Sequence, residues 1–370
     1  YGFGFYSPGG FPGHSDNISI IGNMTEDNQG NIWICTEGRG LYRINKSTCE
    51  TTHYQHSQEG NTISHNNLKC IHFDQKTNKL YIGTHTGGLS VLNLTTNRFS
   101  YFSTDQPASR KLPNNVVNNM ACLGRMLFLV TQGGVVTIDM DADKVIPGYF
   151  DQLLGKAYSN QTMNIFVDSR DRMWLSLFAP GITLYDDRTK KLQAFTPNPA
   201  DPGAFPRHRI IQTFEDRAKQ IFFTTAGSGV VRYDDKTETF TNINDNNQLL
   251  SDHVFKMMEL PSGKLLLTST KGFSVFDPQT QTSQNYCIKD KLPISGLIEE
   301  NGLFKDSDGE IYLAGINGLI TFKEENLQLY KDLFMFSFYN RGMNFVDMAF
   351  LKVKNIESGR INYTRQKTGQ

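Results

Sequence analysis

The sequence predicts an all-β protein, a seven-bladed β-propeller of four-stranded blades that is closed by an N-terminal strand. A strand–turn–strand pattern recurs seven times along the 370 residues, and the nearest approach to a helical pattern is a short insert at residues 150–156. The glycine that opens the second strand of each pattern recurs every 43 to 48 residues, at positions 40, 88, 134, 181, 229, 272 and 318. A repeat of this length is typical of one propeller blade, which cannot bury its faces alone.

The first copy, DNQGNIWICTEGRGLYRIN from Asp27 to Asn45, is the clearest. Its apolar runs are too short for a helix, and Gly and Asx residues that favour tight turns bound them, which is typical of a β-hairpin. The first strand of the hairpin centres on a large side chain that we expect to fill the gap between neighbouring blades. The seven copies place there Trp33, Tyr81, Phe128, Trp174, Phe222, Leu266 and Tyr312.

The second strand of the hairpin follows the glycine as LYRI, LSVL, VVTI, ITLY, VVRY, FSVF and LITF. An Asn or Asp comes next in six of the seven copies. Its short side chain can bond the backbone two residues on and start a turn into a fourth strand. The fourth strand is weakly patterned, for example at residues 51–54 and 98–102, as expected for the outer edge of a blade.

The two ends of the chain differ from the repeats. The seventh copy shows no fourth strand after Phe322, whereas residues 1–17 are rich in glycine and aromatics. We therefore predict that a strand at Phe3–Tyr6 pairs onto blade seven and removes the exposed sheet edges. The predicted organisation is a lead-in with the closing strand at 1–17, a propeller at 18–322 and a non-repeat tail at 323–370. The tail is an unrelated small element, a strand packed on the propeller rim, or a partly disordered segment.

Composition limits the partners. The 37 basic and 37 acidic residues balance, so there is no electrostatic reason to expect binding to nucleic acid or to an anionic membrane. No apolar run approaches 18 residues and no signal peptide is present, so any export signal or anchor is expected outside this sequence. The five cysteines, at 35, 49, 70, 122 and 287, contain no C-x-x-C pair, and we expect Cys35 and Cys70 to be small buried residues.

One face of the predicted ring is the candidate ligand site. The turn between the second and third strands of a blade shares a face with the crossover into the next blade, and we call this face the mouth. The mouth turns supply Glu37, Arg39, His85, Gln132, Phe178, Ser228, Lys271 and Asn317, and the crossovers supply His65, Asn67, Asn114, Asn115, Arg207, His208 and His253. Aromatic, amide, imidazole and cationic groups suit a polar ligand with many hydroxyls. The alternative is that most of these residues are solvated loop residues.

No catalytic residue, metal site or cofactor is predicted. The pairs Glu26–Asp27 and Glu215–Asp216 look like catalytic dyads, but they recur just before the first turn of a repeat, so turn formation explains them. His53 and His56 lack Cys or carboxylate partners at the fixed offsets of a metal site. The G-x-S-x-G, P-loop and H-E-x-x-H patterns are absent.

The repeat resembles the two-component regulator propeller repeat. The likeness is best seen in TEDNQGNIWICTEGRGLYRINKST, LYIGTHTGGLSVLNLTTNRFSYF and IFFTTAGSGVVRYDDKTETF, and it covers about residues 18–322. It implies the periplasmic sensor region of a hybrid two-component histidine kinase of the inner membrane. In that family, many such sensors bind oligosaccharides and regulate glycan-utilisation genes, and the kinase activity lies elsewhere in the polypeptide.

The same resemblance implies further domains in the polypeptide. Family members commonly carry two seven-bladed propellers and a small Ig-like β-sandwich before the membrane. The opening GFGFYSPGGF is similar to the strand that leads from a first propeller into a second, so residues 1–322 are similar to the second propeller alone. The expected partners are an oligosaccharide, a second propeller and the sandwich of the same polypeptide, and a second copy in a homodimer.

Two other functions stay open at this point. A glycosidase or lyase on a propeller scaffold would need paired carboxylates converging at the mouth, where the turns offer only Glu37. A protein-interaction platform would show a large exposed apolar or aromatic patch on one face.

The two tryptophans give a direct test of the strand assignment. If their rings are buried between blades, Trp33→Ala and Trp174→Ala should each lower the free energy of unfolding by about 3 to 5 kcal/mol, as for other buried aromatics. Chemical denaturation measures this loss. A loss near zero with reversible folding would mean that the ring faces solvent and that the strand is wrongly placed.

Overall fold

The structure is a computed structural model that describes residues 4–6, 21–48, 50–243, 249–288, 296–297, 302–316, 318–327, 356–357 and 360–361. Residues 5–321 form one compact unit, and residues 1–4 with 322–370 form another. In the second unit, β29 (Ile356–Glu357) and β30 (Arg360–Ile361) pair antiparallel. Most of the tail lies outside the described residues, so the three alternatives for it remain predictions.

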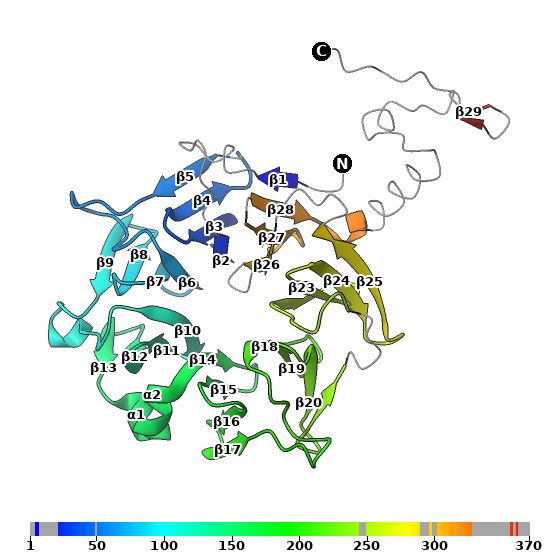
Figure 1. Ribbon diagram of the computed structural model, residues 1–370. Coiled ribbons are helices and arrows are strands. Elements are labelled where there is room, and N and C mark those ends of the chain that lie inside the picture. Colours follow the sequence, from blue (N-terminus) through cyan, green and yellow to red (C-terminus); the bar gives the residue numbers. More distant parts are fainter. Residues whose placement is uncertain are drawn as a thin grey trace. The chain divides into compact units, whose positions relative to one another are not determined.

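Seven four-stranded sheets in the described residues form a ring, with the first strand of each nearest the axis (Figure 1). Blade one contains β2 (Ile21–Glu26), β3 (Asn31–Thr36), β4 (Gly40–Asn45) and β5 (Thr51–Tyr54). Blade two contains β6 (Leu68–Asp74), β7 (Lys79–Thr84), β8 (Leu89–Asn93) and β9 (Arg98–Phe102). Blade three contains β10 (Val117–Leu123), β11 (Met126–Thr131), β12 (Gly134–Asp139) and β13 (Lys144–Ile146).

The remaining blades repeat this order. Blade four contains β14 (Thr162–Val167), β15 (Arg172–Leu177), β16 (Ile182–Asp186) and β17 (Lys191–Phe195). Blade five contains β18 (Ile210–Glu215), β19 (Ile221–Thr225), β20 (Val230–Asp234) and β21 (Thr239–Asn242). Blade six contains β22 (Met257–Glu259), β23 (Leu265–Ser269), β24 (Gly272–Asp277) and β25 (Thr282–Cys287).

Blade seven confirms the predicted closure. Its sheet runs β26 (Leu303–Lys305), β27 (Ile311–Gly315), β28 (Gly318–Phe322) and then β1 (Gly4–Tyr6), so the N-terminal strand supplies the missing outer strand. Short helices in the described residues include η2 (Ala108–Arg110), α1 (Tyr149–Leu154) and α2 (Lys156–Gln161). In the described part of the chain, no helix is long and apolar enough to cross a membrane.

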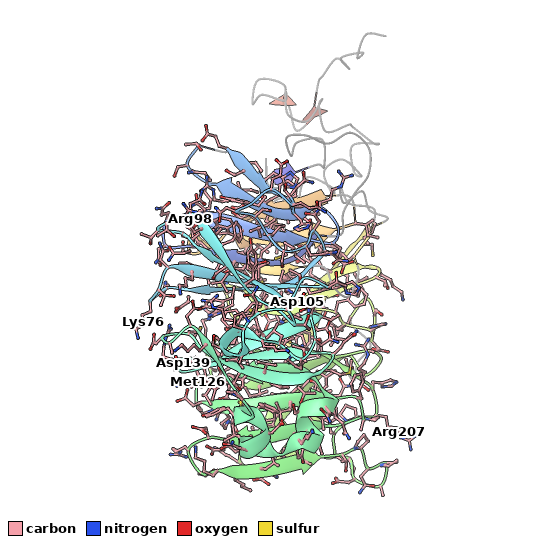
Figure 2. All side chains as sticks on the ribbon, turned by 90° about the vertical axis from the view of Figure 1, so that its left-hand side faces the viewer. Lys76, Arg98, Asp105, Met126, Asp139 and Arg207 are labelled. Atoms are coloured by element: carbon pink, nitrogen blue, oxygen red, sulfur yellow. The ribbon has the colours of Figure 1, made fainter. Side chains whose placement is uncertain are left out.

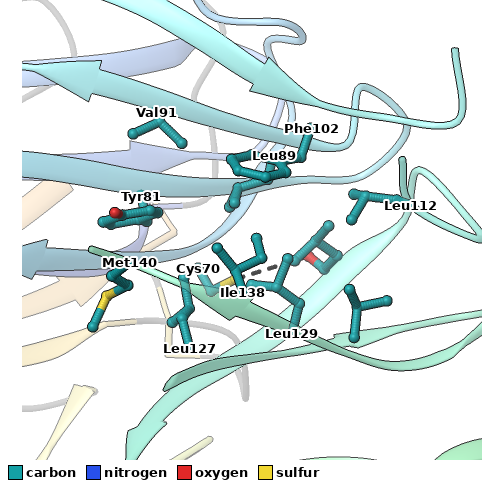
Figure 3. Packing of buried hydrophobic residues seen from close by; sticks show 12 residues of the cluster. Cys70, Tyr81, Leu89, Val91, Phe102, Leu112, Leu127, Leu129, Ile138 and Met140 are labelled. Atoms are coloured by element: carbon teal, nitrogen blue, oxygen red, sulfur yellow. Dashed lines mark hydrogen bonds between the residues drawn. The ribbon is translucent and has the colours of Figure 1, made fainter. Parts of the chain in front are cut away.

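The large side chains at the centre of each second strand are buried, as predicted. Trp33 and Trp174 are 1% and 0% exposed, and their five counterparts are also buried. Figure 3 shows one such layer, where Tyr81 and Leu89 of blade two face Leu127 and Ile138 of blade three. The core is therefore a series of inter-blade layers.

The two cysteines predicted to be core residues are buried. Cys35 is 0% and Cys70 is 5% exposed, and both are free thiols. Burial raises the pKa of the Cys70 thiol to about 12, so it stays protonated and unreactive at neutral pH. Cys49 lies outside the described residues.

The repeated glycine is explained by a close approach of two strands. At Gly40 the backbone has φ +85°, and an added Cβ would lie 2.3 Å from the carbonyl oxygen of Tyr54 in the fourth strand. At Gly88 the corresponding distance to the Phe102 oxygen is 2.2 Å. Only glycine fits such a position without moving the neighbouring backbone.

A buried aspartate organises the first turn of several blades. Asp27 accepts the backbone N–H groups of Gln29 and Asn31, and its Oδ2 accepts the indole N–H of Trp33 at 2.7 Å. The same offset of six residues joins Asp168 to Trp174 at 3.0 Å and Asp306 to the hydroxyl of Tyr312 at 3.2 Å. The carboxylate thus forms the turn and satisfies the polar hydrogen of the core aromatic.

The glutamate before this aspartate has a different role from the one predicted, because it links neighbouring blades. Glu215 accepts the backbone N–H and the hydroxyl of Ser169 in blade four, at 2.7 and 2.8 Å. Glu26 accepts the same two donors of Ser307 in blade seven, again at 2.7 and 2.8 Å. The second link joins the first and last blades and therefore closes the ring independently of β1.

Blade two has its own inter-blade contact. Its Asp74 receives a two-pronged hydrogen bond from Arg125 of blade three, at 2.7 and 2.8 Å. The Arg125 guanidinium holds the pKa of the Asp74 carboxyl well below its usual range. A depressed carboxyl pKa adds stability above the unfolded value of about 4, and this stability is lost as the pH falls below it.

We therefore expect Asp74→Asn to lower the free energy of unfolding at pH 7 by about 1.5 to 3 kcal/mol, which is the usual contribution of a hydrogen bond to a charged group. The difference between wild type and variant should shrink as the pH falls from 6 to 3. Urea denaturation at several pH values measures it. A difference that stays constant with pH would contradict the assignment of the Asp74 carboxylate as the titrating group.

Candidate ligand-binding mouth

Backbone hydrogen bonds join the mouth turns to the crossovers, as the predicted geometry requires. The N–H of Gly40 donates to the oxygen of Asn66 at 2.8 Å, and that of Gly88 donates to Asn115 at 2.9 Å. Seen edge-on, the ring has Arg207 of a crossover at one face, and Lys76 and Asp139 of the other turns at the opposite face (Figure 2). We call this opposite face the base.

Glu37 and Arg39 in the first mouth turn are half-buried and engaged. The Glu37 Oε1 accepts from the Lys69 ammonium of blade two at 2.5 Å. The Arg39 carbonyl oxygen bonds His53 Nε2 at 2.6 Å, and the imidazole stacks on Tyr42 with 4.1 Å between ring centroids. The candidate acid of an enzyme mechanism is thus the partner of a lysine.

The clearest polar strip runs from the crossover into blade five to the crossover into blade six. Arg207 and His208 are exposed, and His208 Nδ1 lies 2.6 Å from the Ser228 hydroxyl in the mouth turn of blade five. His253 forms a β-bridge with Ala226 of the same turn. Two loops that are distant in sequence therefore place an imidazole against a hydroxyl, and the exposed Arg207 precedes that imidazole in the chain.

An exposed aromatic belongs to the mouth turn of the preceding blade. Phe178 is 71% exposed, although its backbone N–H is fixed by the Gln161 oxygen at 3.1 Å. A rigid backbone with a solvent-facing ring offers a flat apolar surface at low entropic cost.

The other predicted residues divide into two groups. His85, Gln132 and Lys271 are exposed on turns that backbone hydrogen bonds hold in place. The crossover groups shape their own loops instead: His65 Nδ1 accepts the Asn67 N–H, Asn114 Oδ1 accepts the Val116 N–H, and Asn115 Oδ1 accepts the Thr104 N–H. Asn317 lies outside the described residues.

The structure adds a cavity that the sequence did not predict, at the blade-three rim of the mouth. It has a volume of about 430 Å³, and α1, the short strand β13 and two crossovers surround it. Its walls include Leu112, Val135, Val136 and Ile146, so it suits an apolar group better than a sugar. The cavity depends on the helical insert, and the pattern of a single repeat does not predict it.

Neither a metal site nor a carboxylate dyad emerges from the geometry. Among the described residues, no group of three or more His, Cys, Asp and Glu side chains is arranged to hold a metal ion. Glu26 and Glu215 are engaged in the inter-blade links, and Asp27 is engaged in its turn.

These features define a seven-bladed propeller with a polar loop face. A family model described as the two component regulator propeller matches residues 13–38. Residues 13–38 are therefore similar to one repeat of that family. No curated protein matches the sequence.

Solved structures of the same fold include extracellular domains of hybrid two-component systems from B. thetaiotaomicron. That of BT3049 covers 87% of this chain and 42% of its own, with a TM-score of 0.66 and 21% identity. That of BT4673 covers 87% and 40%, with a TM-score of 0.64 and 18% identity. This chain thus spans about two fifths of the length of these relatives. Virginiamycin B lyase from Staphylococcus aureus shares the fold at 12% identity, with a TM-score of 0.61 over 87% of this chain and 98% of its own.

The engagement of Glu37 can be tested by mutation. Because Glu37 and Lys69 are both about a quarter exposed, Glu37→Gln should change the free energy of unfolding by less than about 1 kcal/mol. Lys69→Met should give a change of similar size, and the double variant should show little coupling. Denaturation of the four proteins measures this cycle, and a loss of several kcal/mol would show that the pair holds the turn in place.

Proposed function

We propose that this propeller is the ligand-sensing module of an extracytoplasmic sensor region in a hybrid two-component system, and that it binds an oligosaccharide at the mouth to regulate glycan-utilisation genes. The repeat family and the extracellular domains of similar fold support the sensor role. The observation that carries the ligand class is the polar strip in which the Ser228 hydroxyl lies 2.6 Å from His208 Nδ1, with the exposed Arg207 next to it in the chain, together with the exposed ring of Phe178 on the mouth turn of the preceding blade.

The strip matches the chemistry of a sugar chain. Rings such as Phe178 can stack on the apolar face of a pyranose, while hydroxyl, imidazole and guanidinium groups bond its hydroxyls. Because the turns are fixed by backbone hydrogen bonds, little conformational entropy is lost when a ligand binds.

The two alternative functions lack this support. Glu37 is paired with Lys69, so the mouth turns offer no free carboxylate pair for a glycosidase or lyase. In the described part of the chain, the large exposed apolar side chains are Phe178, Leu192 and Ile316, on three separate elements. Single exposed apolar residues are normal on monomers and do not make an interaction platform.

Signalling would require a partner for this unit. A ligand shifts an equilibrium only by how unequally it binds two states. We propose that these states are two arrangements of the propeller relative to a second copy, or to the other propeller and the β-sandwich of a longer periplasmic polypeptide. Histidine kinase activity would then lie in another part of that polypeptide.

A thermal-shift screen against plant, host and microbial oligosaccharides tests the proposal. One glycan class should raise the melting temperature in a saturable way, since a ligand at about 100 times its dissociation constant adds about 2.7 kcal/mol. Phe178→Ala and His208→Ala should each weaken this ligand about tenfold or more, as the loss of a central contact does.

The matched control is Arg188→Ala, which removes an exposed charge from a turn of blade four on the base and should leave the affinity unchanged. Failure of every oligosaccharide to shift the melting temperature would contradict the proposal. A shift that the mouth variants do not alter would contradict the location, and release of product would favour the enzyme.

A further inference from the structure

A second cavity opens on the base, in the groove between blades one and two. Its volume is about 350 Å³, which is within the range of small-molecule sites. Blade one contributes its first turn together with Arg43, Thr52 and Tyr54, and blade two contributes Asn78, Leu94 and Asn97. The walls are thus mainly amide, hydroxyl, phenol and guanidinium groups.

Arg43 is the distinctive group in this cavity. Its Nη2 donates to the Thr52 hydroxyl at 3.0 Å, and its Cζ lies 5.8 Å from the centre of the Trp33 ring. Its Nε is buried without a hydrogen-bond partner. Within the described residues no carboxylate lies within ion-pair distance of this guanidinium, and a buried donor left unpaired is costly.

The one carboxylate in the wall is already saturated. Asp27 accepts five hydrogen bonds, from the N–H groups of Gln29 and Asn31, twice from the Asn31 amide, and from the Trp33 indole. A carboxylate has about four lone-pair sites, so none is left for Arg43 or for a ligand.

In the equivalent groove between blades four and five, cationic and acidic side chains form ion pairs with one another. At the position of Asn31 it has Arg172, and at the position of Leu94 it has Asp235, which accepts from Arg172 Nη1 at 2.5 Å. At the position of Asn97 it has Glu238, which lies 3.5 Å from the Lys191 ammonium. This cavity is only about 120 Å³ in volume.

The groove between blades one and two therefore differs in two ways: it is larger, and it has Leu94 and Asn97 where the groove between blades four and five has Asp235 and Glu238, so these positions offer Arg43 no carboxylate. Guanidinium groups bind carboxylates with matched two-pronged geometry. The surrounding amide and hydroxyl groups can bond sugar hydroxyls, and Tyr54 presents an aromatic ring, half-buried, 5.5 Å from Trp33.

We propose that this base cavity is a second ligand site, distinct from the mouth, and that it binds a hexuronic acid residue with its carboxylate on Arg43. This proposal does not depend on which ligand binds at the mouth. The absence of a carboxylate partner for Arg43 among the described residues favours an acidic ligand, and the polar walls favour a sugar acid.

The test compares D-glucuronic and D-galacturonic acids with D-glucose and D-galactose, by saturation-transfer NMR and by titration of the intact chain. At least one uronic acid should bind, and the matching neutral sugar should bind at least about tenfold more weakly, because it brings no carboxylate to the half-buried Arg43 guanidinium. Comparison of the two acids identifies which hexuronic acid is preferred.

Arg43→Gln should weaken uronic acid binding about tenfold or more. The matched control is Arg232→Gln, which makes the same change at the equivalent strand position of blade five, where the side chain is exposed. A second variant, Leu94→Asp, keeps Arg43 and places in the cavity the carboxylate that blade five has, and it too should abolish binding. Thermal melts verify that each variant is folded.

Equal binding of the acidic and neutral sugars, uronic acid binding that Arg43→Gln and Leu94→Asp leave unchanged, or absence of binding by both acids would each overturn the proposal. Phe178→Ala separates the two sites, because it removes a mouth contact and should leave uronic acid binding at the base intact. Loss of uronic acid binding in Phe178→Ala would place the acid at the mouth and also overturn the proposal.

Discussion

In blades one, four and seven, the core aromatic donates a hydrogen bond to a buried aspartate six residues earlier, and the packing of these blades depends on this contact. A wedge-shaped blade needs a large side chain against its neighbour, and tryptophan brings a polar N–H that must be satisfied when it is buried. Asp27 does this for Trp33 while also accepting the N–H groups of its turn. One side chain therefore couples the turn, the second strand and the inter-blade layer.

Blades two and five, which lack this hydrogen bond for different reasons, show what it contributes. In blade two the aspartate precedes the aromatic by seven residues, and the buried Tyr81 hydroxyl has no hydrogen-bond partner. Its Asp74 is turned to Arg125 of blade three instead. In blade five the aromatic is Phe222, which has no hydrogen to donate, and burial raises the pKa of Asp216 above its usual range. The sequence offset thus decides whether the carboxylate serves its own blade or a neighbour.

Features within a blade could be predicted from the sequence because the same pattern recurs from one blade to the next. The glycine at position 40, the aromatic at position 33 and the closing N-terminal strand all follow from pattern and from an incomplete last copy. Contacts between blades could not be predicted in this way, since Glu215 contacts Ser169 and Glu37 contacts Lys69 only after the ring has formed. Both glutamates were visible in the sequence, but a single repeat cannot show that a side chain acts on the next one. The predicted mouth face is correct, whereas which of its side chains contact a ligand stays a prediction.

Hydrogen bonds hold both faces of the ring, and this bears on the proposed sensing role. Backbone bonds such as Gly40 to Asn66 hold mouth turns to crossovers, and the Glu26 and Glu215 links hold base turns together. Among the residues that the structure describes, no element of the ring shows two packed arrangements, which coupling between distant sites requires. A ligand at the mouth and one at the base should therefore bind independently within this unit. Any coupling between them would have to arise where the ring meets another body, because only there can a bound ligand favour one of two arrangements.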